Sequence, residues 1–283
     1  MKPHTSIMLS ILTATLLASG CSTDVDAEPA PESAPIDCTT TDPDPSAANG
    51  PVAAPGDGWI EVVESGHTYV HTDDTTDSGS ANVTFGAVLE NTTDLIALRF
   101  HVTLTAYVGD TEASGDYVSM HVILPGQRLA TGGGFRHFPE NADDHIDRVD
   151  VTVEVDEWWD GGNDTFTLPA VVTTHVDGFQ DAPPELSSSA EHVLKFDTYS
   201  CTDKATVGEG TVVLRDETGS IIAGDGRFQL HGCGETYAHI QPGTSQHCAM
   251  PSFGLNLDIL DHIDVKTVQP EVYPYIPKTS LTP

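Results

Sequence analysis

The feature of this sequence that most constrains its fold is a strict alternation of apolar and polar residues in two long segments. In Leu98–Val108, apolar side chains occupy every second position, and Arg, His, Thr and Tyr stand between them. In Val149–Val155, valines alternate with Asp, Thr and Glu. Because side chains of a β-strand point to opposite faces in turn, this period of two predicts strands with one buried and one solvated face.

Shorter segments have the same character, and turn residues separate them. The chain has 25 glycines and 19 prolines, and no window of ten or more residues shows a helical period. Many short strands divided by Gly, Pro, Asn and Asp turns are typical of an all-β fold built from sandwiches. The additional predicted strands are Ala81–Glu90, Tyr117–Leu124, Val193–Tyr199, Thr211–Arg215 and Gly226–His231.

Two short motifs recur at one common offset and indicate an internal repeat. Ile123–Gly126 matches Ile240–Gly243, and Asp144–Asp147 matches Asp261–Asp264. A repeat of about 100 residues has the size of one sandwich module. We therefore predict two tandem modules, at 59–160 and 165–270, followed by a C-terminal tail at 271–283.

The order of motifs within the modules resembles that of FxLYD-type immunoglobulin-like domains of bacterial surface proteins and lipoproteins. Val212–Ile222 has a strand, an Asp-x-x-Gly turn and a second strand, and a Pro-Gly turn follows at Ile240–Thr244. The first module has Glu90–Asp94, a long strand to Tyr107, and Ile123–Gln127. The chain departs from the family at Arg215, where an aromatic residue is usual, and Tyr107 is separated from Asp110 by two residues. The resemblance implies tandem immunoglobulin-like sandwiches of a structural or adhesive kind, with no catalytic residues to carry over.

The N-terminus has the layout of a secretory signal at 1–20. Lys2 and His4 precede an apolar run from Ile7 to Leu17, and small residues lead to Cys21. A cysteine at this place resembles the lipobox of bacterial lipoproteins, although Ala18 stands where the family prefers Leu. The resemblance implies a diacylglycerol on the Cys21 sulfur and attachment to a bacterial cell membrane or outer membrane, outside the cytoplasm. A plain secretory signal is the alternative.

Residues 21–58 are expected to form a disordered, acidic, proline-rich linker. Residues 22–58 contain seven prolines and eight acidic residues, and neither Lys nor Arg. Such a segment cannot bury a core, and its like charges repel one another. We interpret it as a stalk that holds the folded part away from the membrane.

The overall charge excludes one class of partner. The chain has 43 acidic and 11 basic residues and a formal net charge of −32. This surface repels phosphate backbones, so no nucleic-acid partner is expected. The acidity is explained either by solubility and solvated sheet faces or by cation binding.

Five cysteines constrain the covalent structure. If Cys21 carries the lipid, four remain, which suffice for two disulfides in an oxidising compartment. Four cysteines allow three pairings. We predict Cys233 with Cys248, around the Pro242-Gly243 turn, and Cys38 with Cys201.

Two acidic clusters are candidate metal sites. His137 and His145 flank Asp143-Asp144 in an irregular loop, and Asp160–Asp164 could supply oxygen ligands for calcium at the hinge between modules. A solvated loop and a simple turn explain the same residues. No cofactor is otherwise expected.

Catalytic signatures are missing from the sequence. It contains no Gly-x-Ser-x-Gly elbow, no His-Glu-x-x-His motif and no phosphate-binding glycine loop. We therefore expect a non-enzymatic, membrane-anchored binding or spacer module that engages an unknown envelope protein or polymer. The alternatives are a calcium- or transition-metal-binding surface protein and an uncharacterised envelope enzyme.

Overall fold

The computed structural model describes residues 53–55, 59–71, 81–138, 145–160, 171–184, 192–203, 205–231, 239–250 and 267–275. The chain divides into two units, residues 1–37 and 38–283, and all described residues belong to the second. These residues form fourteen strands and no helix, which confirms the all-β prediction. Within them there is consequently no apolar helix of bilayer-spanning length. The predicted signal peptide and all of the linker before residue 53 lie outside the described residues.

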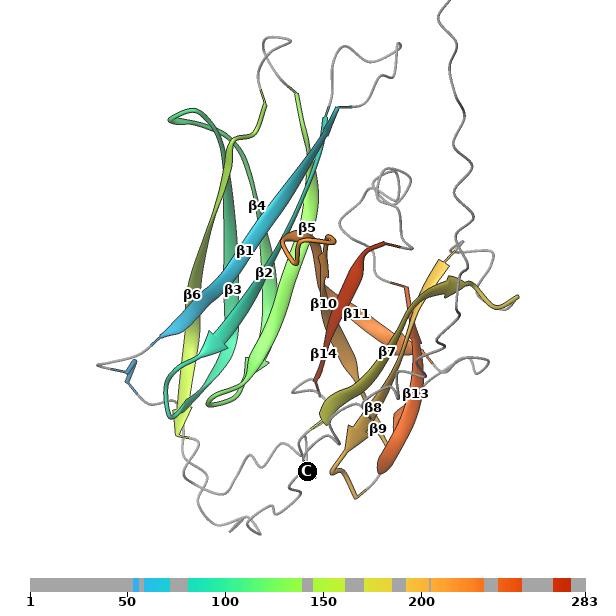
Figure 1. The fold of residues 1–283 in the computed structure, drawn as a ribbon. Helices are drawn as coiled ribbons and strands as arrows, with labels where there is room; N and C mark the ends of the chain where they lie inside the picture. Colours follow the sequence, from blue (N-terminus) through green and yellow to red (C-terminus); the bar gives the residue numbers. More distant parts are fainter. Residues whose placement is uncertain are drawn as a thin grey trace, which may run out of the picture. The chain divides into compact units, whose positions relative to one another are not determined.

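The first six strands form a sandwich of two three-stranded antiparallel sheets (Figure 1). One sheet has the order β1-β2-β5, and the other has the order β4-β3-β6. Alternate side chains of β3, among them Leu98, Phe100 and Val102, enter the core between the sheets, as the period of two predicts. The strands are β1 (Ile60–His71), β2 (Ala81–Asn91), β3 (Leu95–Val108), β4 (Thr111–Ile123), β5 (Arg128–His137) and β6 (Arg148–Asp160).

The later strands form one six-stranded sheet in the order β14-β10-β11-β13-β8-β7, and β9 pairs with β12. Side chains of β8 and β10, which are not neighbours in this order, share one core with Phe228 of β11, so the sheet curls around that core. Strand β14 extends to Tyr275, past residue 270, where the second module is predicted to end. The strands are β7 (Val171–Asp181), β8 (His192–Ser200), β9 (Thr206–Val207), β10 (Glu209–Arg215), β11 (Ile221–His231), β12 (His239–Ile240), β13 (Gly243–Ala249) and β14 (Gln269–Tyr275).

The glycines of the repeated Pro-Gly turns both have a positive φ. Gly126 has φ 67°, and Gly243 has φ 76°. This left-handed region is open to glycine without strain. Gly126 lies two residues before β5, and Gly243 is the first residue of β13. The second repeated motif, at 144–147 and 261–264, lies largely outside the described residues.

The β1-β2-β5 sheet is covered on both faces. One face lies on the core of the first sandwich, and the other packs on β10 and β11. Thr84 Oγ1 donates to the Ile222 carbonyl at 3.1 Å, and the Ala130 N–H donates to Thr211 Oγ1 at 3.0 Å. This explains why β2 is buried along almost its whole length.

Glycines bring these two layers unusually close. A Cβ at Gly132 would lie 2.2 Å from the carbonyl carbon of Gly224, and a Cβ at Gly86 would lie 2.4 Å from the Ala223 carbonyl oxygen. The layers therefore pack backbone against backbone, nearer than the usual spacing of about 10 Å between stacked sheets. The halves of the chain form one packed body in this region.

Arg215 adds a polar link across the same junction. Its guanidinium binds Glu64 of β1 at 2.6 Å and Glu271 of β14 at 2.8 Å. The hydrogen bond to Glu64 is the main reason that the pKa of Arg215 is raised, and the same bond lowers the pKa of Glu64. Arg215, which stands where the FxLYD-type pattern usually has an aromatic residue, therefore has a structural role in this fold.

Replacing Arg215 with Met should destabilise the protein by about 2 kcal/mol, because two carboxylates then face each other without their shared cation. Arg215→Lys is the matched control and should lose less, since it keeps the charge. Urea unfolding at pH 7 measures both. The loss should shrink as pH falls through the lowered pKa of Glu64, because protonation removes the charge that Arg215 stabilises. Equal stability of Arg215→Met and wild type would contradict this assignment.

Candidate functional site

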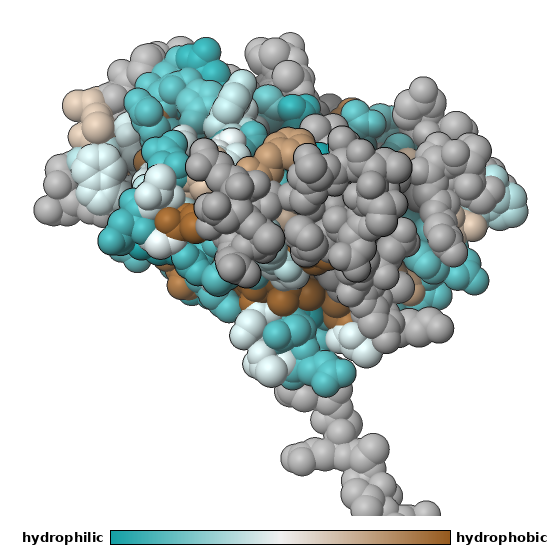
Figure 2. Space-filling view, turned by 90° about the horizontal axis from the view of Figure 1, so that it is seen from above, coloured by the Kyte–Doolittle hydropathy of each residue, from teal (hydrophilic) through white to brown (hydrophobic). Residues whose placement is uncertain are grey.

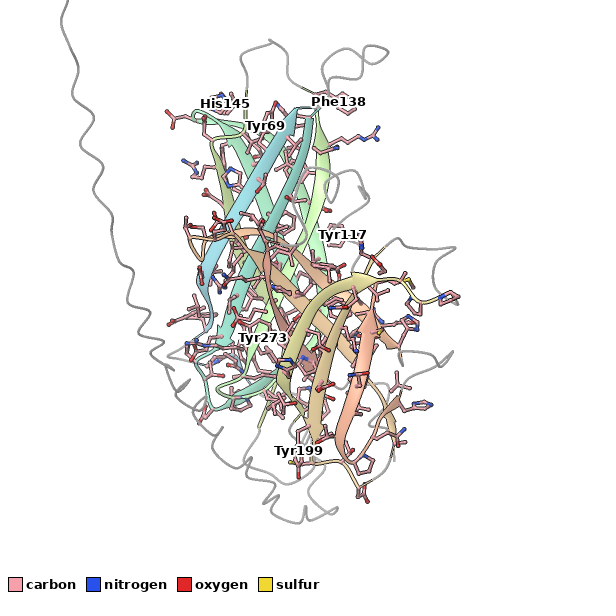
Figure 3. All side chains as sticks on the ribbon, turned by 45° about the vertical axis from the view of Figure 1, so that its right-hand side comes forward. Tyr69, Tyr117, Phe138, His145, Tyr199 and Tyr273 are labelled. Atoms are coloured by element: carbon pink, nitrogen blue, oxygen red, sulfur yellow. The ribbon has the colours of Figure 1, made fainter. Side chains whose placement is uncertain are left out.

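The predicted metal-ligating residues do not assemble in the described part of the chain, where no group of three His, Cys, Asp or Glu side chains could hold an ion. His137 is buried at the end of β5, with its ring centroid 6.3 Å from that of Tyr69. His145 is exposed, and its Nε2 lies 2.9 Å from Asp147 Oδ1. Figure 3 shows His145 and Tyr69 at the same end of the first sandwich. Asp143, Asp144, Asp164 and the side chain of Asp160 lie outside the described residues, so both metal predictions stay predictions.

The outer face of the β4-β3-β6 sheet carries a set of polar and aromatic side chains. We call this surface the β3 face. Strand register places Tyr117 and Thr152 on either side of Thr103, and Ser119 and Glu154 on either side of His101. Its members are Arg99, His101, Thr103, Thr105 and Tyr107 of β3, Tyr117 and Ser119 of β4, and Arg148, Asp150, Thr152, Glu154 and Asp156 of β6.

Neighbouring side chains hold the β3 face in place. His101 lies 3.0 Å from Ser119 Oγ and 3.5 Å from Asp156 Oδ2, and its ring meets that of Tyr117 edge-on. The guanidinium of Arg148 lies 4.2 Å from the centroid of the Tyr107 ring, within cation–π range. These contacts already fix the aromatic rings. Little side-chain entropy is therefore lost when a partner binds.

Tyr117 is a large aromatic residue in β4, an edge strand of its sheet, and its side chain is 69% exposed. Tyr and Arg are enriched at protein interfaces and often provide most of the binding energy. Figure 2, which views the molecule from another side, shows teal hydrophilic residues over much of the described surface, with apolar residues in smaller patches. The combination of Tyr117, Tyr107 and Arg148 on one sheet face is therefore suited to recognition.

A groove of about 650 Å³ lies between β7 and β14 and extends to the turn before β5. Val171 and Val172 of β7 form one wall, and Pro270 and Pro274 of β14 form the other. The remaining lining residues are Gln127, Arg128, Thr173, Thr174, His175, Val176, Glu271, Val272 and Tyr273.

The groove exists because β7 and β14 do not pair. Thr173 Oγ1 donates to the Val272 carbonyl at 2.8 Å, so that carbonyl faces β7. Backbone groups two residues away point the same way, which directs the nitrogens of Pro270 and Pro274 towards β7. Proline has no N–H to donate, and β7 has two register shifts, so no backbone ladder forms between β7 and β14.

A buried hydroxyl–imidazole cluster was missed at the sequence level. His247 Nε2 lies 2.9 Å from Thr198 Oγ1 and 3.1 Å from Ser245 Oγ. The side chain is fully buried, and its Nδ1 has no hydrogen-bond partner among the described residues. Burial lowers the pKa of His247 to about 4. The Ser-x-His spacing on one face of a strand could have indicated the contact, but the burial could not be foreseen.

The strand register removes one of the three possible cysteine pairings. Cys248 lies opposite Lys195 of β8, and Cys201 is six residues further along that strand direction, about 20 Å away. A disulfide needs Cα atoms within about 7 Å, so Cys201 and Cys248 do not pair with each other. Cys38, Cys233 and Cys21 lie outside the described residues.

Peptide mapping of the non-reduced protein should recover Cys233 joined to Cys248 and Cys38 joined to Cys201. Cys248 lies opposite His231, two residues before Cys233, which favours this arrangement over the other one that the register permits. Mapping after reduction and alkylation is the control. A peptide that joins Cys201 to Cys233 would contradict the prediction.

Comparisons with known proteins found no matching family model, no matching curated protein and no matching solved structure.

Proposed function

We propose that this protein is a lipid-anchored, extracytoplasmic binding module of the bacterial envelope, of the tandem immunoglobulin-like kind, and that it acts without catalysis. Cys21 would carry the lipid, and the N-terminal linker would separate the folded unit from the membrane. Two or more acyl chains are needed for stable anchoring, and lipoproteins of the resembled kind carry more than one. The acidic surface makes nucleic acid an unfavourable partner.

The observation that carries the binding proposal is the exposed Tyr117 in the β3 face. The opposite sheet of the same sandwich is covered on both sides, whereas this one presents its outer side chains to solvent. Glu154 and Asp156 give the β6 side of the face an acidic margin. The partner that fits is an envelope protein or polymer that offers basic groups beside a surface on which a tyrosine ring can pack.

The two disulfides belong to the same proposal. Cys248 is buried, and the proposal pairs it with Cys233. Oxidised cysteines fit an export compartment.

A photo-crosslinking residue at Thr103, introduced in intact cells, tests the binding proposal. It should give one defined adduct, whereas the same residue at Glu217, in an exposed turn of the other half, should give at least about tenfold less. Adding Tyr117→Ala should lower the Thr103 adduct by about tenfold, as for an interface anchor. Equal yields at Thr103 and Glu217, or an adduct indifferent to Tyr117→Ala, would contradict a role for the β3 face.

A further inference from the structure

A small cavity lies at one margin of the first sandwich, between β1 and β6. These strands are edges of different sheets and lie close together. The cavity has a volume of about 190 Å³. A cavity of roughly 150 Å³ admits a benzene molecule, so this one has room for the end of a single side chain. The residues that line it include Trp59, Ile60, Val153, Glu154, Val155 and Trp158.

Two tryptophan rings from distant parts of the chain border this cavity. Trp158, near the end of β6, is buried in the sandwich core together with Ile60. Trp59, directly before β1, is 60% exposed. One ring is therefore fixed by packing, and the other is accessible from solvent. Trp is the aromatic residue that attracts cations most strongly.

An irregularity in β3 accompanies the burial of Trp158. Arg99 has φ 51°, a left-handed conformation that is uncommon for residues other than glycine. Beside it the alternation of β3 is lost, since all three residues of Ile96–Leu98 are buried. Ala97 is the register partner of Trp158. By alternation Trp158 would share the solvated outer face with Asp156, but at this end of the sheet it is buried beside the cavity.

Glu154 gives the cavity a negative charge that no basic side chain of the described residues pairs with. Three other acids of β6 each have a basic partner, which leaves Glu154 as the acid of this strand that is open to an external cation. The net charge of −32 also attracts cations to the surface. The three pairs are Asp150 with Arg148, Asp156 with His101, and Glu157 with Arg99.

We propose that this cavity binds the ammonium end of a lysine side chain that the envelope partner presents. The ammonium group gains cation–π attraction from Trp59 and an ion pair with Glu154. Val153 and Val155 contact the aliphatic stem, which lysine buries readily while its charge stays near water. The cavity offers a single carboxylate, so most of the five donors of an arginine would lack acceptors there.

This inference rests on the proposed binding function and names the group of the partner that is recognised. Glu154 belongs to the β3 face as well as to the cavity. Its register partner His101 contacts the ring of Tyr117. One partner can therefore pack on Tyr117 and insert a lysine beside Trp59.

Tryptophan fluorescence tests the proposal on the mature, detergent-extracted protein. The chain has three tryptophans, of which two line the cavity and Trp159 follows the second, so the signal reports on this site. At constant ionic strength, N-acetyl-lysine amide should give a saturable change with a Kd on the order of 1–10 mM. N-acetyl-norleucine amide, which has the same carbon stem without the ammonium, should bind about tenfold more weakly. Choline, which has no N–H for Glu154, should also bind about tenfold more weakly.

Two surface variants assign the binding to the cavity. Glu154→Gln and Trp59→Leu should each raise the Kd for the lysine amide about threefold, and the double variant about tenfold. Trp158 remains as the reporter in all of them. Glu217→Gln, which removes one acid from an exposed turn of the other half, is the matched control and should bind like the wild type. Thermal melts show whether each variant is folded.

Three results would each overturn the proposal. They are the absence of a saturable change up to about 100 mM lysine amide, ten times the upper expected Kd, equal binding of norleucine amide or choline, and a Kd that neither variant changes. The crosslinking test at Thr103 separates this failure from that of the proposed function. A Thr103 adduct that still depends on Tyr117 while the lysine amide does not bind would reject the cavity and retain the β3 face.

Discussion

Replacing Gly132 with Ala is expected to destabilise the protein by about 3 kcal/mol or more, the upper range for added volume in a packed core. The new Cβ would lie 2.2 Å from the carbonyl carbon of Gly224 and 2.4 Å from its Cα. Both are backbone atoms, so neither can rotate away, and the two layers must separate. For a folded unit of this size the melting midpoint should fall by about 6–12 °C.

Gly133→Ala is the matched control for this prediction. It adds the same methyl group one residue along the same strand, on the opposite face. There the nearest atom is Cζ of Phe85 at 3.2 Å, a side-chain atom that can shift. The control should lose less than about 1 kcal/mol. Similar melting midpoints for the two variants would contradict the close approach of the layers.

Acidification should destabilise the protein through His247 by on the order of 3 kcal/mol between pH 6.5 and 4. Burial holds the pKa of this imidazole at about 4 in the folded protein, against 6.5 in an unfolded chain. Between these two pH values the unfolded chain binds a proton that the folded protein does not. The free energy of unfolding therefore decreases as the pH is lowered. Below pH 4 both states are protonated and the decline from this group ends.

His247→Gln isolates this contribution from that of the many carboxylates. Gln keeps a polar group near Thr198 and Ser245 but does not titrate. The difference in unfolding free energy between the wild type and this variant, measured by urea unfolding from pH 7.5 to 4, should decrease by about 1.4 kcal/mol per pH unit below pH 6.5. A difference that stays constant with pH would show that His247 is not held neutral by burial.

The sequence predicted much of the strand content, because one-sided strands leave a visible pattern. Leu98–Val108 and Val149–Val155 lie within β3 and β6, whose outer faces are solvated. Ala81–Glu90 was also recognised, as β2. Strand β5 was not predicted, because Gly132–Gly134 have no side chains to alternate. Gly132 must be glycine because of the backbone of Gly224, which lies more than 90 residues away in the chain.

The candidate sites were less predictable than the fold. Exposure of Tyr117 follows from its register opposite Thr103, and the alternation of β3 already indicated a polar outer face. The groove could not be foreseen, because it needs Pro270 and Pro274 to face β7, a strand about 100 residues earlier. Arg215 was noted only as a departure from a family pattern. Its ion pairs with Glu64 and Glu271 depend on contacts between the two halves.

We propose that a lipid on Cys21 holds this all-β unit at the membrane. Intact-mass measurement of the protein extracted from the membrane fraction tests this most directly. The expected mass is that of a chain beginning at Cys21 with a diacylglycerol and a further acyl chain, lowered by four hydrogens for two disulfides. A soluble mature protein, or a membrane form that begins at Met1 without modification, would contradict the claim.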